Sequence, residues 1–117
     1  MVHKADATPP ELTPIGFEVL LSLASGPLHG YGIKLDIEER TSGELSLGSG
    51  TLYQAIQRLE RDGLIAEAAP PRGARDARRG RSYRLQPSGR AALDHHLRGL
   101  SRAIEYARAR KLLPSTK

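Results

Sequence analysis

The stretch GSGTLYQAIQRLERDGLI, residues 48–65, places two glycines and a serine directly before a segment with helical spacing. Glycine-rich loops that open a helix can bind phosphate through backbone N–H groups. A Walker loop needs G-x-x-x-x-G-K-[ST], and residues 43–51 read GELSLGSGT, which lacks the lysine. The dinucleotide fingerprint also fails, because Tyr53 stands at the third glycine position. The stretch therefore argues against a nucleotide site.

The segment after these glycines has the period of an amphipathic helix. Its apolar side chains would form one buried face: Leu52, Ala55, Ile56 and Leu59. The opposite face and its flanks carry amides, guanidinium groups and a phenol but no carboxylate: Gly50, Tyr53, Gln54, Gln57, Arg58 and Arg61. We expect Ser49 to cap this helix and Gly63 to end it. Such a face suits reading of DNA bases, because Gln pairs with adenine and Arg with guanine.

Positive charge is concentrated in the second half of the chain. The formal net charge of +5 divides into −5 for residues 1–69 and +10 for residues 70–117. The stretch 69–81, APPRGARDARRGR, carries five arginines and a single acid, Asp76. Its prolines and glycines exclude the interior of a helix or strand, and arginine suits phosphate contacts and narrow minor grooves. Considered alone, the run could equally be a solvated loop that only aids solubility.

Length and composition limit the class of protein. A chain of 117 residues can bury one modest core, so we expect a single domain with an extension. It has no cysteine, which excludes disulfides and thiolate metal sites. No apolar run approaches the ~18 residues of a membrane span, and no signal-peptide core opens the sequence. We therefore expect a cytoplasmic protein.

Catalytic and metal-binding patterns do not stand out. No Ser/His/Asp set, carboxylate pair or Cys nucleophile is recognisable, so we expect no enzyme and no cofactor. His95 and His96 are adjacent and would point about 100° apart on a helix, which is poor geometry for one metal ion. We therefore expect no metal site.

Two helices are expected before the polar-faced one. Residues 1–11 have no period and contain two adjacent prolines, so we expect a flexible arm. Thr13 and Pro14 suit the N-cap and first position of a helix that residues 26–27, Gly-Pro, terminate. A second helix is expected over residues 29–40, where apolar residues recur four apart.

After Gly63 the pattern changes to that of strands. Residues 64–68 are short and apolar, and residues 82–86 alternate, with Tyr83 and Leu85 on one face. The two segments can pair as an antiparallel hairpin. The arginine-rich run then lies at its tip, in a loop longer than an ordinary hairpin turn.

Pro87 opens a last long helix. Its apolar residues are spaced by 4, 3, 4 and 3, as in the seam of a coiled coil: Leu93, Leu97, Leu100, Ile104 and Ala107. The seam covers only about two heptads, so packing of this stripe on its own domain is the alternative.

Three helices followed by a hairpin make a winged helix, a variant of the helix-turn-helix. The expected fold class is mainly α with a small β-hairpin, followed by a C-terminal dimerisation helix. The expected parts are a flexible arm (1–11), a winged-helix DNA-binding domain (12–86), the dimerisation helix (87–113) and a tail (114–117).

Several motifs occur in order over residues 12–93: GPLHGY at 26–31, GTLY at 50–53, RLE at 58–60 and DGLI at 62–65. With them the chain resembles the PadR family of bacterial transcriptional regulators. The resemblance implies a dimeric winged-helix repressor that contacts an operator with the GTLY helix and the wing. It also implies that the C-terminal helix packs across the two-fold axis against the partner's N-terminal region.

The candidate DNA-contacting residues combine the polar helix, the segment before it and the wing: His29, Tyr31, Ser49, Gly50, Thr51, Tyr53, Gln54, Gln57, Arg58, Arg61, Arg72, Arg75, Arg78, Arg79 and Arg81. His29 could instead be a structural helix cap. The candidate dimer interface is Ile15, Val19, Leu93, Leu97, Leu100, Ile104 and Ala107. The expected partners are a pseudo-palindromic double-stranded operator and a second copy of the chain.

The chain departs from the family pattern at several positions. Gln54 replaces the proline that often follows GTLY, and Gln86 replaces a threonine cap before the last helix. The C-terminal part is one helix, as in the short members of the family. The chain has no Trp and only Tyr106 in that helix, so no pocket for a planar effector is predicted. A winged-helix protein-interaction module and a non-specific nucleic-acid binder are the alternative functions.

Overall fold

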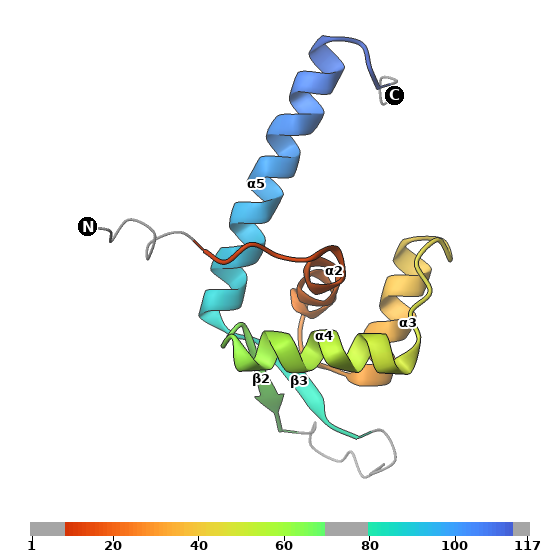
Figure 1. The fold of residues 1–117 in the computed structure, drawn as a ribbon, viewed down its shortest axis with the longest axis vertical. Helices are drawn as coiled ribbons and strands as arrows, with labels where there is room; N and C mark the ends of the chain where they lie inside the picture. The colour runs from red at the N-terminus through yellow and green to blue at the C-terminus, as the bar shows by residue number, and fades with distance from the viewer. Residues whose placement is uncertain (1–8, 70–79, 114–117) are drawn as a thin grey trace, which may run out of the picture.

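Four helices and a small antiparallel sheet make up the fold in the computed structural model, which describes residues 9–69 and 80–113 (Figure 1). The helices are α2 (Pro14–Leu23), α3 (Gly30–Arg40), α4 (Ser49–Arg61) and α5 (Pro87–Ala109). The strands are β1 (Leu28–His29), β2 (Ile65–Ala68) and β3 (Ser82–Leu85), in the sheet order β1-β3-β2. The expected class, mainly helical with a small β-structure, is confirmed. Within the described ranges, no helix has the length and apolar character to cross a membrane.

Helix α2 lies at the centre of the molecule and contacts α3, α4 and α5 (Figure 1). It begins as expected, because the Thr13 hydroxyl accepts a hydrogen bond from the backbone N–H of Gly16 at 2.9 Å. Val19 and Leu20 are fully buried. α2 is therefore the support on which the other helices pack.

Helix α3 starts one residue later than expected, because His29 is its N-cap. The Nδ1 atom of His29 accepts a hydrogen bond from the N–H of Gly32 at 3.0 Å. Leu28 and His29 form β1, which pairs with β3 opposite Tyr83 and Ser82. The expected two-stranded hairpin is therefore part of a three-stranded sheet. A strand of two residues is too short to show alternation in the sequence.

Helix α4 differs from the prediction at its start and agrees with it at its end. Its N-cap is Gly48, so the expected cap by Ser49 is wrong, and Ser49 is the first helical residue. Gly63 follows the helix with φ +78°, and its N–H donates to the carbonyl of Glu60 at 3.0 Å. The N–H of Leu64 reaches back to the carbonyl of residue 59 at 2.9 Å, which completes a Schellman motif.

Strands β2 and β3 form the wing in the antiparallel pairing expected, with Ile65 opposite Leu85 and Glu67 opposite Tyr83. Both strands are one residue shorter than predicted. The loop between them, which carries Arg72, Arg75, Arg78 and Arg79, lies outside the described residues.

The first turns of α5 are fixed on the turn after α4. Gly89 lies so close to the carbonyl oxygen of Leu64 that a Cβ atom at Gly89 would overlap it. The hydroxyl of Ser88 donates a hydrogen bond to the carbonyl of Gly63 at 2.7 Å. These two contacts join α5 to the start of the wing.

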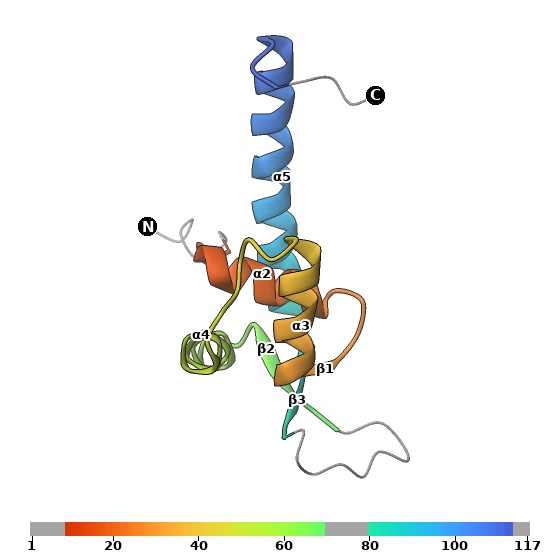
Figure 2. The same cartoon turned by 90° about the vertical axis from the view of Figure 1, so that its right-hand side faces the viewer.

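Beyond this junction α5 packs on α2 and then leaves it. Leu93 is 3% exposed, and the ring of His96 lies 4.5 Å from that of Phe17 on α2. The rest of α5 projects away from the winged-helix body (Figures 1 and 2).

Candidate nucleic-acid interface

All eight residues of α4 that we expected to contact DNA are exposed: Ser49, Gly50, Thr51, Tyr53, Gln54, Gln57, Arg58 and Arg61. The opposite face supplies the core residues Leu52, Ile56 and Leu59. The described parts of the chain offer no hydrogen-bond or ion-pair partner to Gln57 or Arg61. Both side chains are also exposed.

Tyr53 joins α4 to the start of α3. A Cβ atom at Gly30 would overlap the Tyr53 hydroxyl and come within 2.9 Å of its Cζ atom. Tyr53 is nevertheless 40% exposed. Its ring therefore packs on Gly30 while one edge faces solvent beside the polar face of α4.

His29 and Tyr31 lie at the same end of α3. Their rings are nearly parallel, 6° apart in plane and 6.5 Å apart at their centroids. Tyr31 is 57% exposed. Of the two roles considered for His29, the cap is the one that the structure supports through the Gly32 hydrogen bond. Contact of His29 or Tyr31 with DNA stays a prediction.

A shallow hollow of about 450 Å³ runs between the start of α2 and the polar face of α4. Its lining combines two residues of α2 or its cap with six residues of α4: Thr13, Ile15, Thr51, Gln54, Ala55, Gln57, Arg58 and Arg61. Polar groups of α4 thus line a concave surface in addition to an exposed helix face.

The base of the wing carries a cluster of charged residues around Tyr83. The Nε atom of Arg81 lies 3.8 Å from a carboxylate oxygen of Glu67. The hydrogen bond to Tyr83 raises the pKa of Arg81, and the carboxylates of Glu67 and Glu60 add to this shift. Burial raises the pKa of Tyr83, while Arg81 opposes that shift. At neutral pH the cluster therefore contains a charged guanidinium and a neutral phenol.

Arg84 is a wing cation that the sequence reasoning missed. It is exposed on β3, and its guanidinium donates to the side-chain oxygen of Gln86 at 2.7 Å. The alternation that places Tyr83 in the core also places Arg84 outside, so the signal was present in the sequence.

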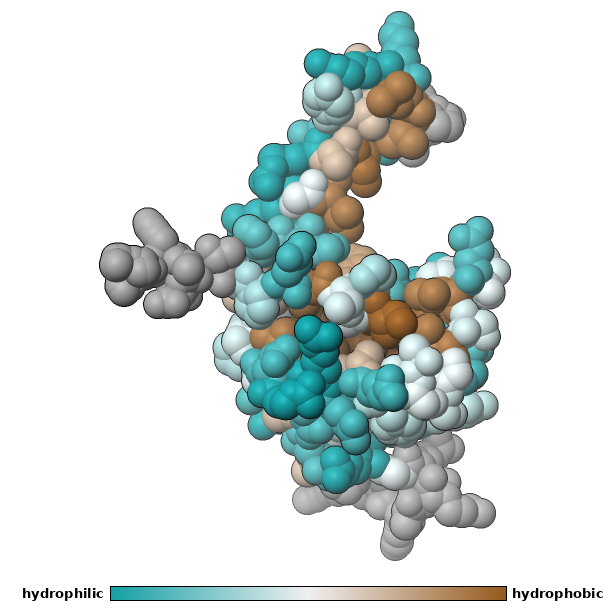
Figure 3. All heavy atoms as spheres, in the orientation of Figure 1, coloured by the Kyte–Doolittle hydropathy of each residue, from teal (hydrophilic) through white to brown (hydrophobic). Residues whose placement is uncertain are grey.

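The apolar stripe of α5 divides into a covered part and an open part. Leu97 is 38% exposed, and Leu100 and Ile104 are each 41% exposed. Figure 3 shows apolar surface along the side of α5 that faces the open space above the winged-helix body. Val19 and Leu93, which we expected at the dimer interface, are 0% and 3% exposed in the subunit core. We therefore remove Val19 and Leu93 from the proposed dimer interface, because a partner subunit cannot reach their buried side chains.

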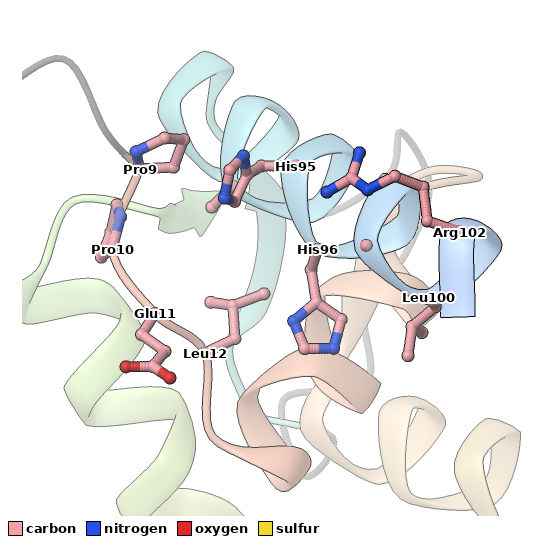
Figure 4. A pocket seen from close by; sticks show the side chains of 10 residues that line it. Pro9, Pro10, Glu11, Leu12, His95, His96, Leu100 and Arg102 are labelled. Atoms are coloured by element: carbon pink, nitrogen blue, oxygen red, sulfur yellow. The ribbon is translucent and has the colours of Figure 1, made fainter. Parts of the chain in front are cut away.

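A second hollow, of about 420 Å³, lies between residues 9–12 and α5 (Figure 4). Leu12 points into it, and the side chains of His95, His96 and Arg102 lie around its α5 side. Leu100 also lines it, so this hollow borders the open part of the α5 stripe. Residues 9–11 of the expected arm thus run beside α5, and residues 1–8 lie outside the described part. No group of three or more potential metal ligands occurs among the residues described.

The arrangement of α3, α4 and the wing defines a winged helix-turn-helix protein, with the polar face of its third helix open to solvent. The chain belongs to the PadR-like family of transcriptional regulators, whose family model matches residues 19–95.

Solved structures of the same fold include a PadR family transcription regulator from Clostridium difficile R20291, with a TM-score of 0.66 and 22% identity over 83% of this chain and 97% of that one. Bacillus subtilis PadR, solved in complex with operator DNA, matches with a TM-score of 0.60 and 23% identity over 73% of this chain and 47% of that one.

A curated relative is an uncharacterized 37.1 kDa protein in transposon TN4556 of Streptomyces fradiae. It is 40% identical over 84 residues, which are 72% of this chain. The chain spans 22% of the length of that relative.

Proposed function

We propose that this chain is a dimeric, sequence-specific DNA-binding repressor that reads bases with α4 and holds phosphates with its wing. The observation that carries the proposal is the outward face of α4. It presents amide and guanidinium groups without a carboxylate and without partners among the described residues. Amide and guanidinium groups can pair with the major-groove edges of adenine and guanine.

The size of an α-helix matches the width of the major groove of DNA. A major groove about 12 Å wide admits one α-helix, and α4 has three and a half turns exposed along one side. Thr51 and Ser49 at its N-terminal end suit phosphate contacts, which position the helix but carry no sequence information. Arg81 and Arg84 of the wing suit a second group of phosphates.

The open stripe of α5 supports the dimer. Leu97, Leu100 and Ile104 continue the spacing of a helical seam but remain about 40% exposed in the described subunit. A second copy that covers them would link two α4 helices, so that they meet two half-sites. We therefore propose an interface of Leu97, Leu100, Ile104 and Ala107, and we leave out Ile15, which lines the hollow beside the polar face of α4.

The family supports the regulatory role. Its members are transcriptional regulators, and Bacillus subtilis PadR was solved with operator DNA. We carry the operator over to this chain as part of the proposal. The repressing sign rests on the resemblance to the family.

Selection from a pool of random-sequence duplexes tests this function. We expect enrichment of an inverted repeat whose half-sites are about one helical turn, 10–10.5 base pairs, apart. Enrichment of a motif without symmetry would contradict the dimer. Recovery of unselected DNA would leave a non-specific nucleic-acid binder, and recovery of none would indicate a protein-interaction module.

A further inference from the structure

The wing cation Arg81 lies beside carboxylates of its own chain. Glu67 stands directly opposite Tyr83 in the register of β2 and β3. Arg81 immediately precedes β3 and lies two residues before Tyr83. The 3.8 Å separation between Arg81 Nε and Glu67 Oε1 agrees with this placement.

This cluster lies between the wing and the helix proposed to read DNA. Helix α4 contacts β2, and Figure 2 shows the two side by side. The carboxylate of Glu60 on α4 also raises the pKa of Arg81, so its negative charge acts on the same guanidinium as that of Glu67. A phosphate that binds Arg81 comes close to the Glu67 carboxylate, which lies 3.8 Å from that guanidinium.

We propose that Glu67, assisted by Glu60, competes with DNA phosphates for Arg81 and so sets the affinity of the protein for DNA. The inference rests on the proposed DNA-binding function and assigns to it an affinity-determining residue. The side chains of Arg81 and Glu67 are 59% and 56% exposed, so solvent and phosphate reach both. An exposed ion pair of this kind is weak, whereas a guanidinium binds phosphate with two hydrogen bonds. Phosphate therefore displaces Glu67, and the displaced carboxylate then repels the DNA.

The effect is independent of base sequence, because phosphates carry no sequence information. Neutralising Glu67 raises affinity for the selected duplex and for a shuffled duplex by the same factor. If the released Arg81 gains one phosphate contact, the dependence of log affinity on log salt becomes steeper by about 0.9.

Fluorescence anisotropy with both duplexes across a salt series tests the proposal. The variants are Glu67→Gln, Arg81→Ala and the double variant. Glu39→Gln is the matched control, because it removes the same charge from an exposed position at the end of α3 away from β1. We expect Glu67→Gln to bind both duplexes about three- to ten-fold more tightly at low salt. In the Arg81→Ala background the gain should fall to that of Glu39→Gln.

A gain no larger than that of Glu39→Gln, or a gain that persists without Arg81, would overturn the proposal. Glu60→Gln is a second variant at the same cluster, and we expect from it a smaller gain that also depends on Arg81. If the wild-type protein binds neither duplex, the proposed function fails as well. If the wild type binds both duplexes and Glu67→Gln changes neither affinity, only the role of Glu67 is overturned and the proposed function stands.

Discussion

The two halves of α5 carry the same apolar spacing but lie in different surroundings. In the first half Gly89, Ala92 and Leu93 are buried against the winged-helix body. In the second half Leu97, Leu100 and Ile104 are each about 40% exposed, and Leu112 just beyond the helix is 69% exposed. The contact between His96 and Phe17 marks the point where the subunit stops covering the helix. The spacing alone thus predicts an amphipathic helix but not the molecule that covers it.

The two sets of cations proposed to bind DNA also differ in their surroundings. Arg61 on α4 has no acidic partner within the described residues, whereas Arg81 at the wing lies beside Glu67 and Glu60. We infer that Arg61 can contact a base without first breaking an ion pair. Arg81, in contrast, must exchange Glu67 for a DNA phosphate.

Leu97→Asp should have the largest effect, because it places a carboxylate in the proposed apolar interface. We expect subunits to separate in analytical ultracentrifugation and operator affinity to fall about 10²–10⁴-fold, since linkage of two readers is lost. Ala109→Asp is the control, because Ala109 is exposed, lies about 120° around α5 from Leu97 and gains the same single negative charge. A Leu97→Asp variant that stays dimeric would contradict the proposed interface.

Leu93→Ala tests the covered half of the helix. It removes a side chain that is 3% exposed, so we expect a loss of about 2–5 kcal/mol in the free energy of unfolding, measured by urea denaturation. Leu112→Ala, at 69% exposure, should change it by no more than about 0.5 kcal/mol. Equal losses at both positions would contradict the difference in burial between the two halves of α5.

Arg61→Ala tests the open face of α4. We expect a loss of about 1–3 kcal/mol in binding to the selected duplex, together with relaxed preference at one base pair. Arg84→Ala on the wing should weaken binding to every duplex alike and reduce the salt slope by about 0.9. Equal effects of Arg61→Ala on selected and shuffled duplexes would exclude base reading by this residue.

Alanine substitutions at the two glycines of α5 should have the smallest effects on the free energy of unfolding. A Cβ atom at Gly89 would overlap the backbone carbonyl of Leu64, so Gly89→Ala should destabilise the protein by about 1–3 kcal/mol. Gly99 has no atom within 4 Å of such a Cβ, and Gly99→Ala should stabilise the helix by about 0.5–1 kcal/mol. Thermal unfolding of both variants checks the signs. Destabilisation by Gly99→Ala would indicate that a partner covers this side of α5.

The sequence predicts those parts of the fold that local chemistry determines. Thr13 and Pro14 start α2, and Gly63 ends α4, because capping and a left-handed turn need particular residue types. The sequence predicts the N-cap of α4 at Ser49, one residue after the observed cap Gly48, because glycine and serine both suit that position.

Features that depend on distant pairing could not be read from the sequence. Strand β1 consists of two residues that pair with β3, far along the chain. The Arg81 and Glu67 contact likewise depends on the register of two strands. Val19 and Leu93 fit the apolar spacing of an interface as well as that of a core, and only the packing of α5 on α2 separates the two.

The most direct test of the central claim compares binding of the selected duplex with that of a shuffled duplex of the same composition. Fluorescence anisotropy at increasing salt gives both affinities and their salt slopes. We predict a preference of about 10³-fold or more for the selected duplex at physiological salt, with a slope that reports several phosphate contacts. Equal, steeply salt-dependent binding of the two duplexes would contradict a sequence-specific regulator.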